Sequence, residues 1–304
     1  MSSEWPAWND LAGIRAHLDA GADPDALVHG WRPPLDFAAE YGTPEVVAEL
    51  AGRVTDVDAV NEGRTALWTA VSEGRPDNAR ALMEAGADPW RPLIAGWSPA
   101  RLSLAGPHPD LFPPRAELSA AESAAVAEAP RLIEALAPGR DGGFSLACVA
   151  GITAAEAARR LEASPAEGPE EDDEFDDLDD LLVGATDVPG GCVIVQPWGY
   201  AAQTPGVTKA LSSGTVCYAM YANPKSGNQG QIVRDGTIEG WDLHPGGGVP
   251  RPDATPEEVL LTYLYKHEAP AYCYAYTSLR PTDSRSLTGP PDQWLQLPTR
   301  DHWT

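Results

Sequence analysis

Apolar and small residues in the first third of the chain recur at the spacing of amphipathic helices. Residues 44–50 read PEVVAEL and residues 76–83 read PDNARALM. Each begins with a proline, whose missing N–H costs nothing at the first position of a helix. An alanine- and leucine-rich segment precedes each of them, a few residues after a glycine. The pattern predicts pairs of short helices joined by tight turns.

These helix pairs recur at a fixed interval. Gly30, Gly63 and Gly96 are equally spaced along the chain, and segments 20–24 and 85–89 both read AGADP. In these segments we expect the glycine to end a helix in the left-handed conformation and the proline to stop it. Period and motif together resemble the ankyrin repeat.

The resemblance covers residues 8–113. It divides that segment into a leading half unit ending at His29, full units 30–62 and 63–95, and a degraded closing unit. The Thr-Pro-Leu-His tetrapeptide of the family reads PPLD, TALW and SPAR in the three turns. No unit keeps the histidine, so other bonds must replace those it makes across the turn.

The resemblance implies that partners bind at the turn tips and the concave face of the first helices. These places hold tryptophan and arginine, the residues most often found at binding hot spots: Trp31, Arg32, Arg64, Trp68, Trp90 and Trp97. The alternative is that the tryptophans fill irregular turns or pack against the rest of the chain, and Trp68 fits that alternative best. Both interpretations stay open at this point.

Residues 114–142 predict a helical segment that caps or extends the repeats, because residues 115–136 are rich in alanine and glutamate. After it, strand patterns occupy residues 144–150, 192–197 and 215–221, and residues 272–276 form either a further strand or a buried apolar run. Helix patterns occupy residues 154–161, 204–211 and 255–266, and residues 231–241 form a hairpin around Asp-Gly. We therefore expect residues 143–304 to form an α+β domain with a mainly antiparallel sheet, and the whole chain to belong to the α+β class.

Three stretches of this domain are similar to an uncharacterised domain family of high-GC bacteria. They are GCVIVQPWGY at 191–200, LSSGT at 211–215 and RDGTI at 234–238, and the similarity extends over residues 143–297. The resemblance implies a shared fold and no particular activity, so function must be argued from individual sites.

The charge of the chain is strongly negative. It has 45 acidic against 21 basic residues, a formal net charge of −24. This charge argues against direct binding of nucleic acid or of an anionic membrane, and favours a neutral or basic protein partner. No apolar run is long enough to span a membrane and the N-terminus lacks the pattern of a secretory signal, so we expect a cytoplasmic protein.

Ten acidic residues lie between Glu167 and Asp180, within a predicted acidic loop at 165–181 that is either a solvated linker or a mimic of nucleic acid.

Groups able to carry out catalysis are scarce. The four cysteines lie far apart without metal-ligand spacing, so we expect buried free thiols, no metal and no cofactor. Cys217, His244 and Asp242 can be drawn as a catalytic set, but nothing near Cys217 would lower its pKa. The polar loops after two strands offer a ligand site instead, at Asn223, Lys225, Asn228 and His244.

Two hypotheses follow from these residues. The first is a non-enzymatic binding protein that uses the repeat surface and the acidic domain, in one version an immunity- or antitoxin-like inhibitor of a basic partner. The second is an enzyme or small-ligand sensor with its site in the C-terminal domain and the repeats as a targeting module.

Overall fold

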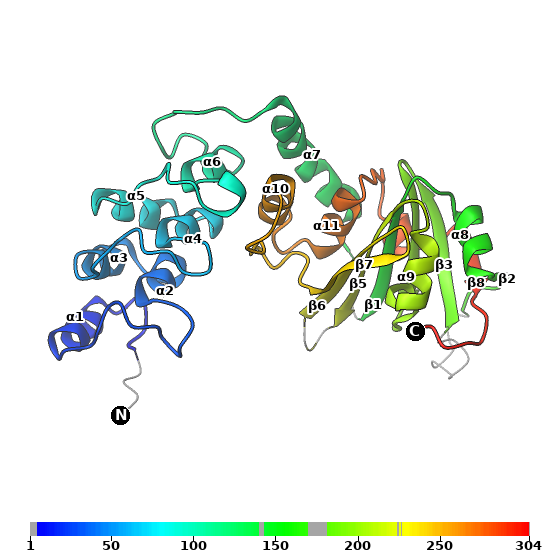
Figure 1. Ribbon diagram of the computed structural model, residues 1–304, viewed down its shortest axis with the longest axis horizontal. Helices are drawn as coiled ribbons and strands as arrows, with labels where there is room; N and C mark the ends of the chain where they lie inside the picture. Colours follow the sequence, from blue (N-terminus) through cyan, green and yellow to red (C-terminus); the bar gives the residue numbers. More distant parts are fainter. Residues whose placement is uncertain (1–4, 140–142, 170–180, 224, 226, 304) are drawn as a thin grey trace. The chain divides into compact units, whose positions relative to one another are not determined.

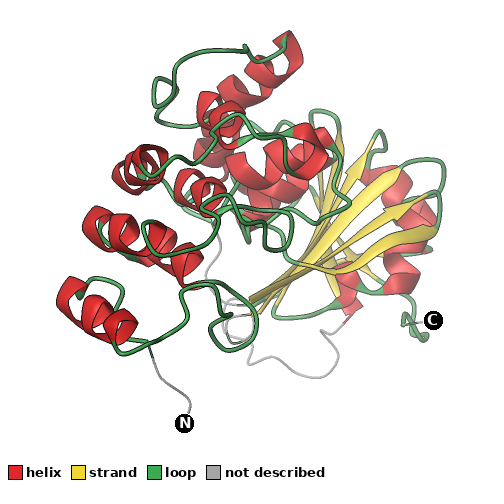
Figure 2. Cartoon of the chain, turned by 60° about the vertical axis from the view of Figure 1, so that its left-hand side comes forward, coloured by secondary structure: helices red, strands yellow, loops and turns green. Residues whose placement is uncertain are grey.

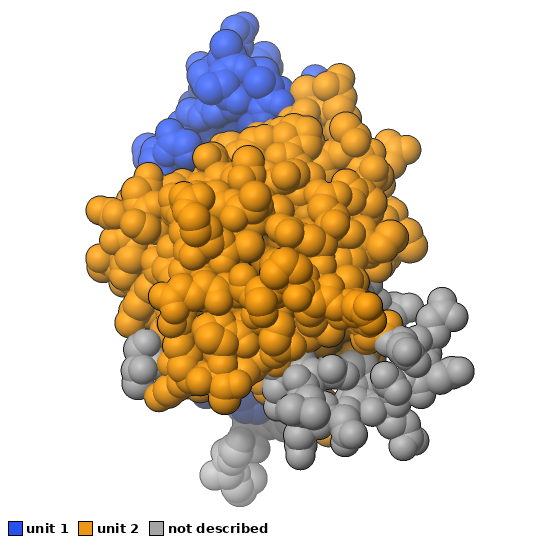
Figure 3. Space-filling model, turned by 90° about the vertical axis from the view of Figure 1, so that its right-hand side faces the viewer, with its two compact units in different colours: residues 1–126, 249–264 blue, residues 127–248, 265–304 orange. Residues whose placement is uncertain are grey.

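The computed structural model describes residues 5–139, 143–169, 181–223, 225 and 227–303. The chain divides into two compact units, which are coloured separately in Figure 3. We call residues 1–126 together with 249–264 the repeat unit, and residues 127–248 together with 265–304 the sheet unit.

Short helices in pairs build the repeat unit, stacked in the order of the sequence (Figure 1). They are α1 (Leu11–Asp19), α2 (Pro34–Tyr41), α3 (Pro44–Ala51), α4 (Ala66–Ser72), α5 (Pro76–Glu84), the 3-10 turn η1 (Ile94–Gly96), α6 (Pro99–Leu104) and α10 (Pro256–Leu264). Proline occupies the first position of α3 and α5, as predicted. Gly21 and Gly86 follow α1 and α5 at φ of 94° and 100°, which confirms the predicted left-handed helix ends.

The turns between helix pairs repeat the same backbone geometry. Gly30, Gly63 and Gly96 all have positive φ, and so does the residue before each of them. Two successive residues at positive φ make a type I′ turn, which explains why glycine recurs at the same place in every unit. Each turn directs the residue after the glycine to the tip of a small hairpin.

Apolar side chains from successive helix pairs merge into one core, which includes Ile14, Leu50, Leu67 and Leu82. Ala254, Val259 and Leu260, from the loop before α10 and from α10 itself, belong to the same core. The sequence-based division placed α10 in the C-terminal domain, whereas in the structure it completes the core of the repeat unit. A helix so distant in sequence leaves no local signal of where it packs.

An eight-stranded antiparallel sheet, whose strands are yellow in Figure 2, forms the centre of the sheet unit. The strand order is β2-β8-β3-β4-β1-β5-β6-β7. Its strands are β1 (Phe144–Ala150), β2 (Ser164–Ala166), β3 (Leu182–Val188), β4 (Gly191–Pro197), β5 (Val216–Asn223), β6 (Gly227–Arg234), β7 (Thr237–Leu243) and β8 (Gln293–Gln296). Its helical elements are α8 (Ala154–Leu161), η3 (Ala201–Gln203), α9 (Pro205–Leu211), α11 (Ala269–Tyr276) and α12 (Arg285–Thr288), and α7 (Ala120–Leu136) runs from one unit into the other.

Helices cover both faces of the sheet. Cys217 and Ala219 of β5 pack in the core formed with α8 and α9. Tyr218, between them, points to the opposite face and contacts the rings of Tyr272 and Tyr276 from α11. This arrangement confirms the predicted α+β class with an antiparallel sheet.

Several elements of the sheet unit differ from those predicted from the sequence. Of the two alternatives for residues 272–276, the strand is wrong and the buried apolar run is confirmed, because this segment lies largely buried in α11, with Pro270 near the helix start. Strands β2, β3 and β8 had not been predicted. The hairpin around Asp235-Gly236 is confirmed, with both residues at positive φ. Most of the acidic run at 167–180 lies outside the described residues.

Candidate functional site

The first turn tip carries a cluster of aromatic side chains. We define the aromatic cluster as Trp5, Trp8, Trp31, Phe37 and Tyr41. The Phe37 ring stacks on Trp8 at 5.4 Å between centroids, meets Trp31 edge-on at 5.7 Å and lies 6.5 Å from Tyr41. Trp31 remains 52% exposed and Tyr41 55% exposed, so the cluster presents two large rings to solvent.

Arg32 lies beneath these rings and is buried, and both terminal nitrogens of its guanidinium make polar contacts. Its Nη1 lies 2.7 Å from a carboxylate oxygen of Glu40, and its Nη2 donates to the backbone carbonyl of Asp36 at 3.1 Å. The guanidinium carbon also lies 4.6 Å from the centre of the Phe37 ring. Only 8% of Arg32 is exposed, so it joins the aromatic cluster to the polar groups of α2 rather than projecting toward a partner.

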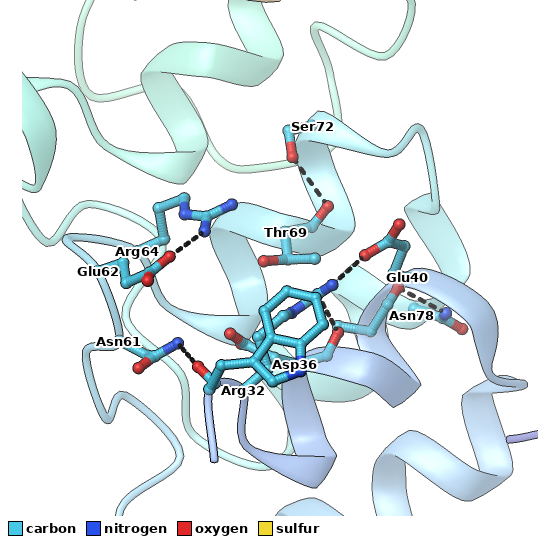
Figure 4. A network of polar contacts seen from close by, with 11 residues as sticks. Arg32, Asp36, Glu40, Asn61, Glu62, Arg64, Thr69, Ser72 and Asn78 are labelled. Atoms are coloured by element: carbon cyan, nitrogen blue, oxygen red, sulfur yellow. Dashed lines mark hydrogen bonds and ion pairs between the residues drawn. The ribbon is translucent and has the colours of Figure 1, made fainter. Parts of the chain in front are cut away.

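A second arginine lies near the same helix. Figure 4 shows Arg64 pairing with Glu62, and the two atoms of this ion pair are 3.3 Å apart. The Nε atoms of Arg32 and Arg64 and the hydroxyl of Thr69, all buried, have no hydrogen-bond partner among the described residues. Buried polar atoms normally have hydrogen-bond partners, so these three atoms are available to bind water or polar groups of a ligand.

The carboxyl group of Asp36 stands where the repeat family has its turn histidine. Burial raises the pKa of Asp36 to about 6, although Arg32 and Arg64 act in the opposite direction. Glu40 and Glu62 add to the upward shift through charge repulsion. We define the polar network as Arg32, Asp36, Glu40, Glu62, Arg64 and Thr69 (Figure 4). It holds three acidic and two basic side chains.

Asn78 joins two successive repeats through hydrogen bonds of its side chain. Its side-chain amide, on α5, donates to the carbonyls of Ala38, Ala39 and Gly42 at 3.0–3.3 Å. The three carbonyls lie at the end of α2, one repeat earlier. The asparagine therefore fixes the helix that carries the polar network.

The other predicted binding residues of the repeats lie in different surroundings. Trp97 is completely buried: its indole N–H donates to the carbonyl of Pro256 at 3.0 Å, and Arg101 lies over its ring. Trp68 is also buried and Trp90 is half-buried against the repeat core. The expectation that Trp68 and Trp97 contact a partner therefore needs correction, since neither has surface to offer.

Phe37, Tyr41, Asp36 and Glu40 were not predicted, although aspartate in place of the family's histidine was a visible signal.

In the sheet unit, the four predicted ligand residues come from two neighbouring loops. The Lys225 N–H donates to the side chain of Asn223 at 2.8 Å, and a ring nitrogen of His244 lies 3.1 Å from the carbonyl of Asn228. Asn223 and Asn228 also line a cavity, which Lys225 and His244 do not.

Among the described residues, the cysteines form neither a catalytic site nor a metal-binding site. All four cysteines are buried and free, as predicted. Burial raises the pKa of the Cys217 thiol far above its ordinary value, which disfavours the reactive thiolate. Within the described ranges, no three His, Cys, Asp or Glu residues are close enough to hold a metal ion. In the same ranges no helix has the length and apolar character needed to cross a bilayer.

Comparisons with known proteins identify the N-terminal region. Residues 7–92 match the family model described as "Ankyrin repeats (3 copies)". The chain is also similar to a rice protein, "Zinc finger CCCH domain-containing protein 50" of Oryza sativa subsp. japonica, with 36% identity over 124 residues. That alignment covers 34% of this chain and 19% of the rice protein. The stacked helix pairs of residues 7–92 are thus ankyrin repeats, which support a role in protein–protein interaction.

Proposed function

We propose that this chain is a non-enzymatic binding protein that grips a neutral or basic partner protein at the first turn tip of its ankyrin repeats. The observation that carries the proposal is the aromatic cluster, which exposes Trp31 and Tyr41 at a turn tip where Glu40 pairs with Arg32 and the more exposed Glu62 pairs with Arg64. Rigid aromatic rings bind with little loss of side-chain entropy, and adjacent carboxylates favour a basic segment over an acidic one.

The fixed geometry of this surface also supports binding. Trp31 follows a type I′ turn, its ring meets Phe37 edge-on, and Asn61 donates from the next turn to the Trp31 carbonyl at 3.0 Å. A surface that is already ordered loses less conformational entropy when a partner binds. Exposed rings in such a setting are therefore suited to recognition.

A narrower version of the proposal is an immunity- or antitoxin-like inhibitor. The net charge of −24 would accelerate association with a basic nuclease and would oppose direct binding of nucleic acid to the chain. In this version the captured partners are strongly basic proteins, and binding suppresses their activity on nucleic acid.

The test is quantitative affinity capture from a cell lysate with the full chain and with a Trp31→Ala, Tyr41→Ala double variant. The matched control is Trp241→Ala, which removes a 43% exposed tryptophan from β7 in the sheet unit. We expect the double variant to lose the partners that the wild type and the control retain, and those partners to carry basic segments. Equal recovery by all three proteins would exclude the first turn tip as the binding surface.

A further inference from the structure

A cavity of about 530 Å³ lies within the sheet unit. Its walls come from the ends of α7 and β5, the starts of β1 and β6, the N-terminus of α11, and α12. Cavities of this size accommodate small organic molecules, and most proteins have few of them. The surface proposed for the protein partner lies in the repeat unit, so this cavity requires a separate explanation.

The lining changes from apolar to polar between the floor and the mouth. Phe144, Met220 and Leu287 are buried and supply apolar surface at the floor. The exposed lining residues, which therefore lie at the mouth, are Ala137, Pro138, His267 and Glu268, and the last two supply its polar side chains. A ligand that matches this gradient has an apolar body and a polar end.

Hydrogen bonds hold the mouth in place. The N–H of His267 donates to the carbonyl of Gly246 at 2.7 Å, and His267 itself has φ of 66°. A ring nitrogen of His244 contacts the carbonyl of Asn228 at 3.1 Å. These contacts join the 244–248 loop, which does not itself line the cavity, to the lining residues His267 and Asn228. A non-glycine residue held at positive φ is a form of strain that recurs at ligand sites.

The charge of the lining distinguishes between kinds of ligand. Among the described lining residues there is one carboxylate, that of Glu268, and no lysine or arginine. The side chains of Asn223 and Asn228 lie half-buried in the same lining and add amide oxygens that can accept hydrogen bonds. The described part of the lining offers an anionic ligand no lysine or arginine, and the negative charge of the whole chain would repel such a ligand.

We propose that this cavity binds a small amphipathic cation, a molecule with an apolar body in the cavity and one ammonium group at Glu268. The apolar body is buried by the floor, and the ammonium group donates to the Glu268 carboxylate and to the asparagine amides. This binding activity is separate from the proposed recognition of a protein partner, and either can hold without the other.

Three probes with the same indole ring and ethylene linker test the proposal on the full chain. They are tryptamine, which is a cation, tryptophol, which is neutral, and indole-3-propionate, which is an anion. Isothermal titration calorimetry should show tryptamine binding about three- to fivefold more tightly than tryptophol, since an exposed ion pair contributes a modest free energy. Indole-3-propionate should bind most weakly.

Two kinds of variant separate the charge from the cavity. Glu268→Gln should remove the preference for tryptamine and leave tryptophol unchanged, whereas the control Glu134→Gln, an exposed change on α7 outside the lining, should keep the preference. Ala222→Trp and Ala137→Trp should each fill the cavity and abolish binding of all three probes, and Ala137 is exposed, so its replacement does not disturb the core.

The proposal is overturned if no probe binds at millimolar concentration, if indole-3-propionate binds best, or if both filling variants bind tryptamine as the wild type does. A preference for tryptamine that survives Glu268→Gln would also overturn it. Loss of partner capture with unchanged tryptamine binding would leave this site standing and count only against the repeat surface.

Discussion

Trp31 and Trp97 occupy the same place in the repeat, directly after a turn glycine and two periods apart, but their surroundings are opposite. Trp31 is more than half exposed and rests edge-on against Phe37. Trp97 is completely buried and donates a hydrogen bond to the carbonyl of Pro256, at the start of α10. The first tip ends in solvent, whereas the third is covered by another segment of the chain.

The difference shows that a position in a repeat fixes backbone geometry but not burial. All three tips share the turn with two residues at positive φ. What covers each tip depends on segments outside the period, such as α10. A tryptophan at a repeat tip therefore indicates a binding residue only where no other segment of the chain covers it.

Trp97→Ala is the strongest test of this contrast. Removing a fully buried tryptophan leaves a cavity and breaks its bond to Pro256, so we expect the repeat unit to lose about 3–5 kcal/mol of its free energy of unfolding. Urea unfolding combined with hydrogen exchange of peptides from α4 to α6 and from α10 would measure the loss. Trp97→Phe should lose less, and a loss under about 1 kcal/mol for Trp97→Ala would contradict the burial of this side chain.

The same contrast explains which parts of the site the sequence predicted. The period, the turn glycines and the AGADP segments act locally, so the repeats and the location of Trp31 and Arg32 at a tip could be predicted. The burial of Trp97 could not, because it depends on α10, which comes much later in the chain, after most of the sheet. Phe37 and Tyr41 were overlooked because their i, i+4 relation on α2 suggests ordinary core packing.

In the sheet unit, the prediction failed where local preference and packing disagree. The alternation YCYAY at 272–276 suggests a strand, but Pro270 near the helix start and ring packing of Tyr272 and Tyr276 against Tyr218 favour α11. Strand β8, which pairs with both β2 and β3, lies within a proline-rich tail, and the composition of this tail does not suggest a strand. The cavity combines distant segments, so the sequence could indicate its loops but not its apolar floor.

Asp36→Asn tests the charged side of the first tip. The folded chain holds the Asp36 proton up to about pH 6, whereas the unfolded chain releases it near 3.8. Stability from this group is full below the lower value and falls as pH rises through the upper one, by about 3 kcal/mol in all. The variant should therefore be the more stable protein at pH 8 and should lack this component of the decline between pH 4 and 7.

Hydrogen exchange of α2 at pH 4.5 and 8 would measure this difference. Asp77→Asn is a suitable control, because Asp77 is an exposed carboxylate at the start of the neighbouring helix α5. An identical pH dependence in wild type and Asp36→Asn would show that Asp36 is not buried beside Glu40 and Glu62.

Asn78→Ala tests what holds the first tip to the next repeat. The substitution leaves three backbone carbonyls at the end of α2 without the amide that now bonds them, and should lower the free energy of unfolding by about 2 kcal/mol. The equivalent position one period later is Leu111, which packs against the apolar core instead. Faster hydrogen exchange of residues 34–42 than of α6 would be the signature, and uniform acceleration along the stack would argue against this local role.

Trp31→Ala should have the smallest effect on folding and a large one on binding. The ring makes an edge-on contact with Phe37 worth about 1 kcal/mol, and half of its surface already faces solvent, so unfolding should change by no more than about that amount. If Trp31 is a hot spot, partner affinity should fall at least tenfold in the same variant. A titration of captured partner against Trp31→Ala and Trp31→Phe separates the two roles, because phenylalanine restores ring packing but not the indole N–H. Equal affinity of all three proteins would mean that the exposed tip, like the buried one, serves only the structure of its turn.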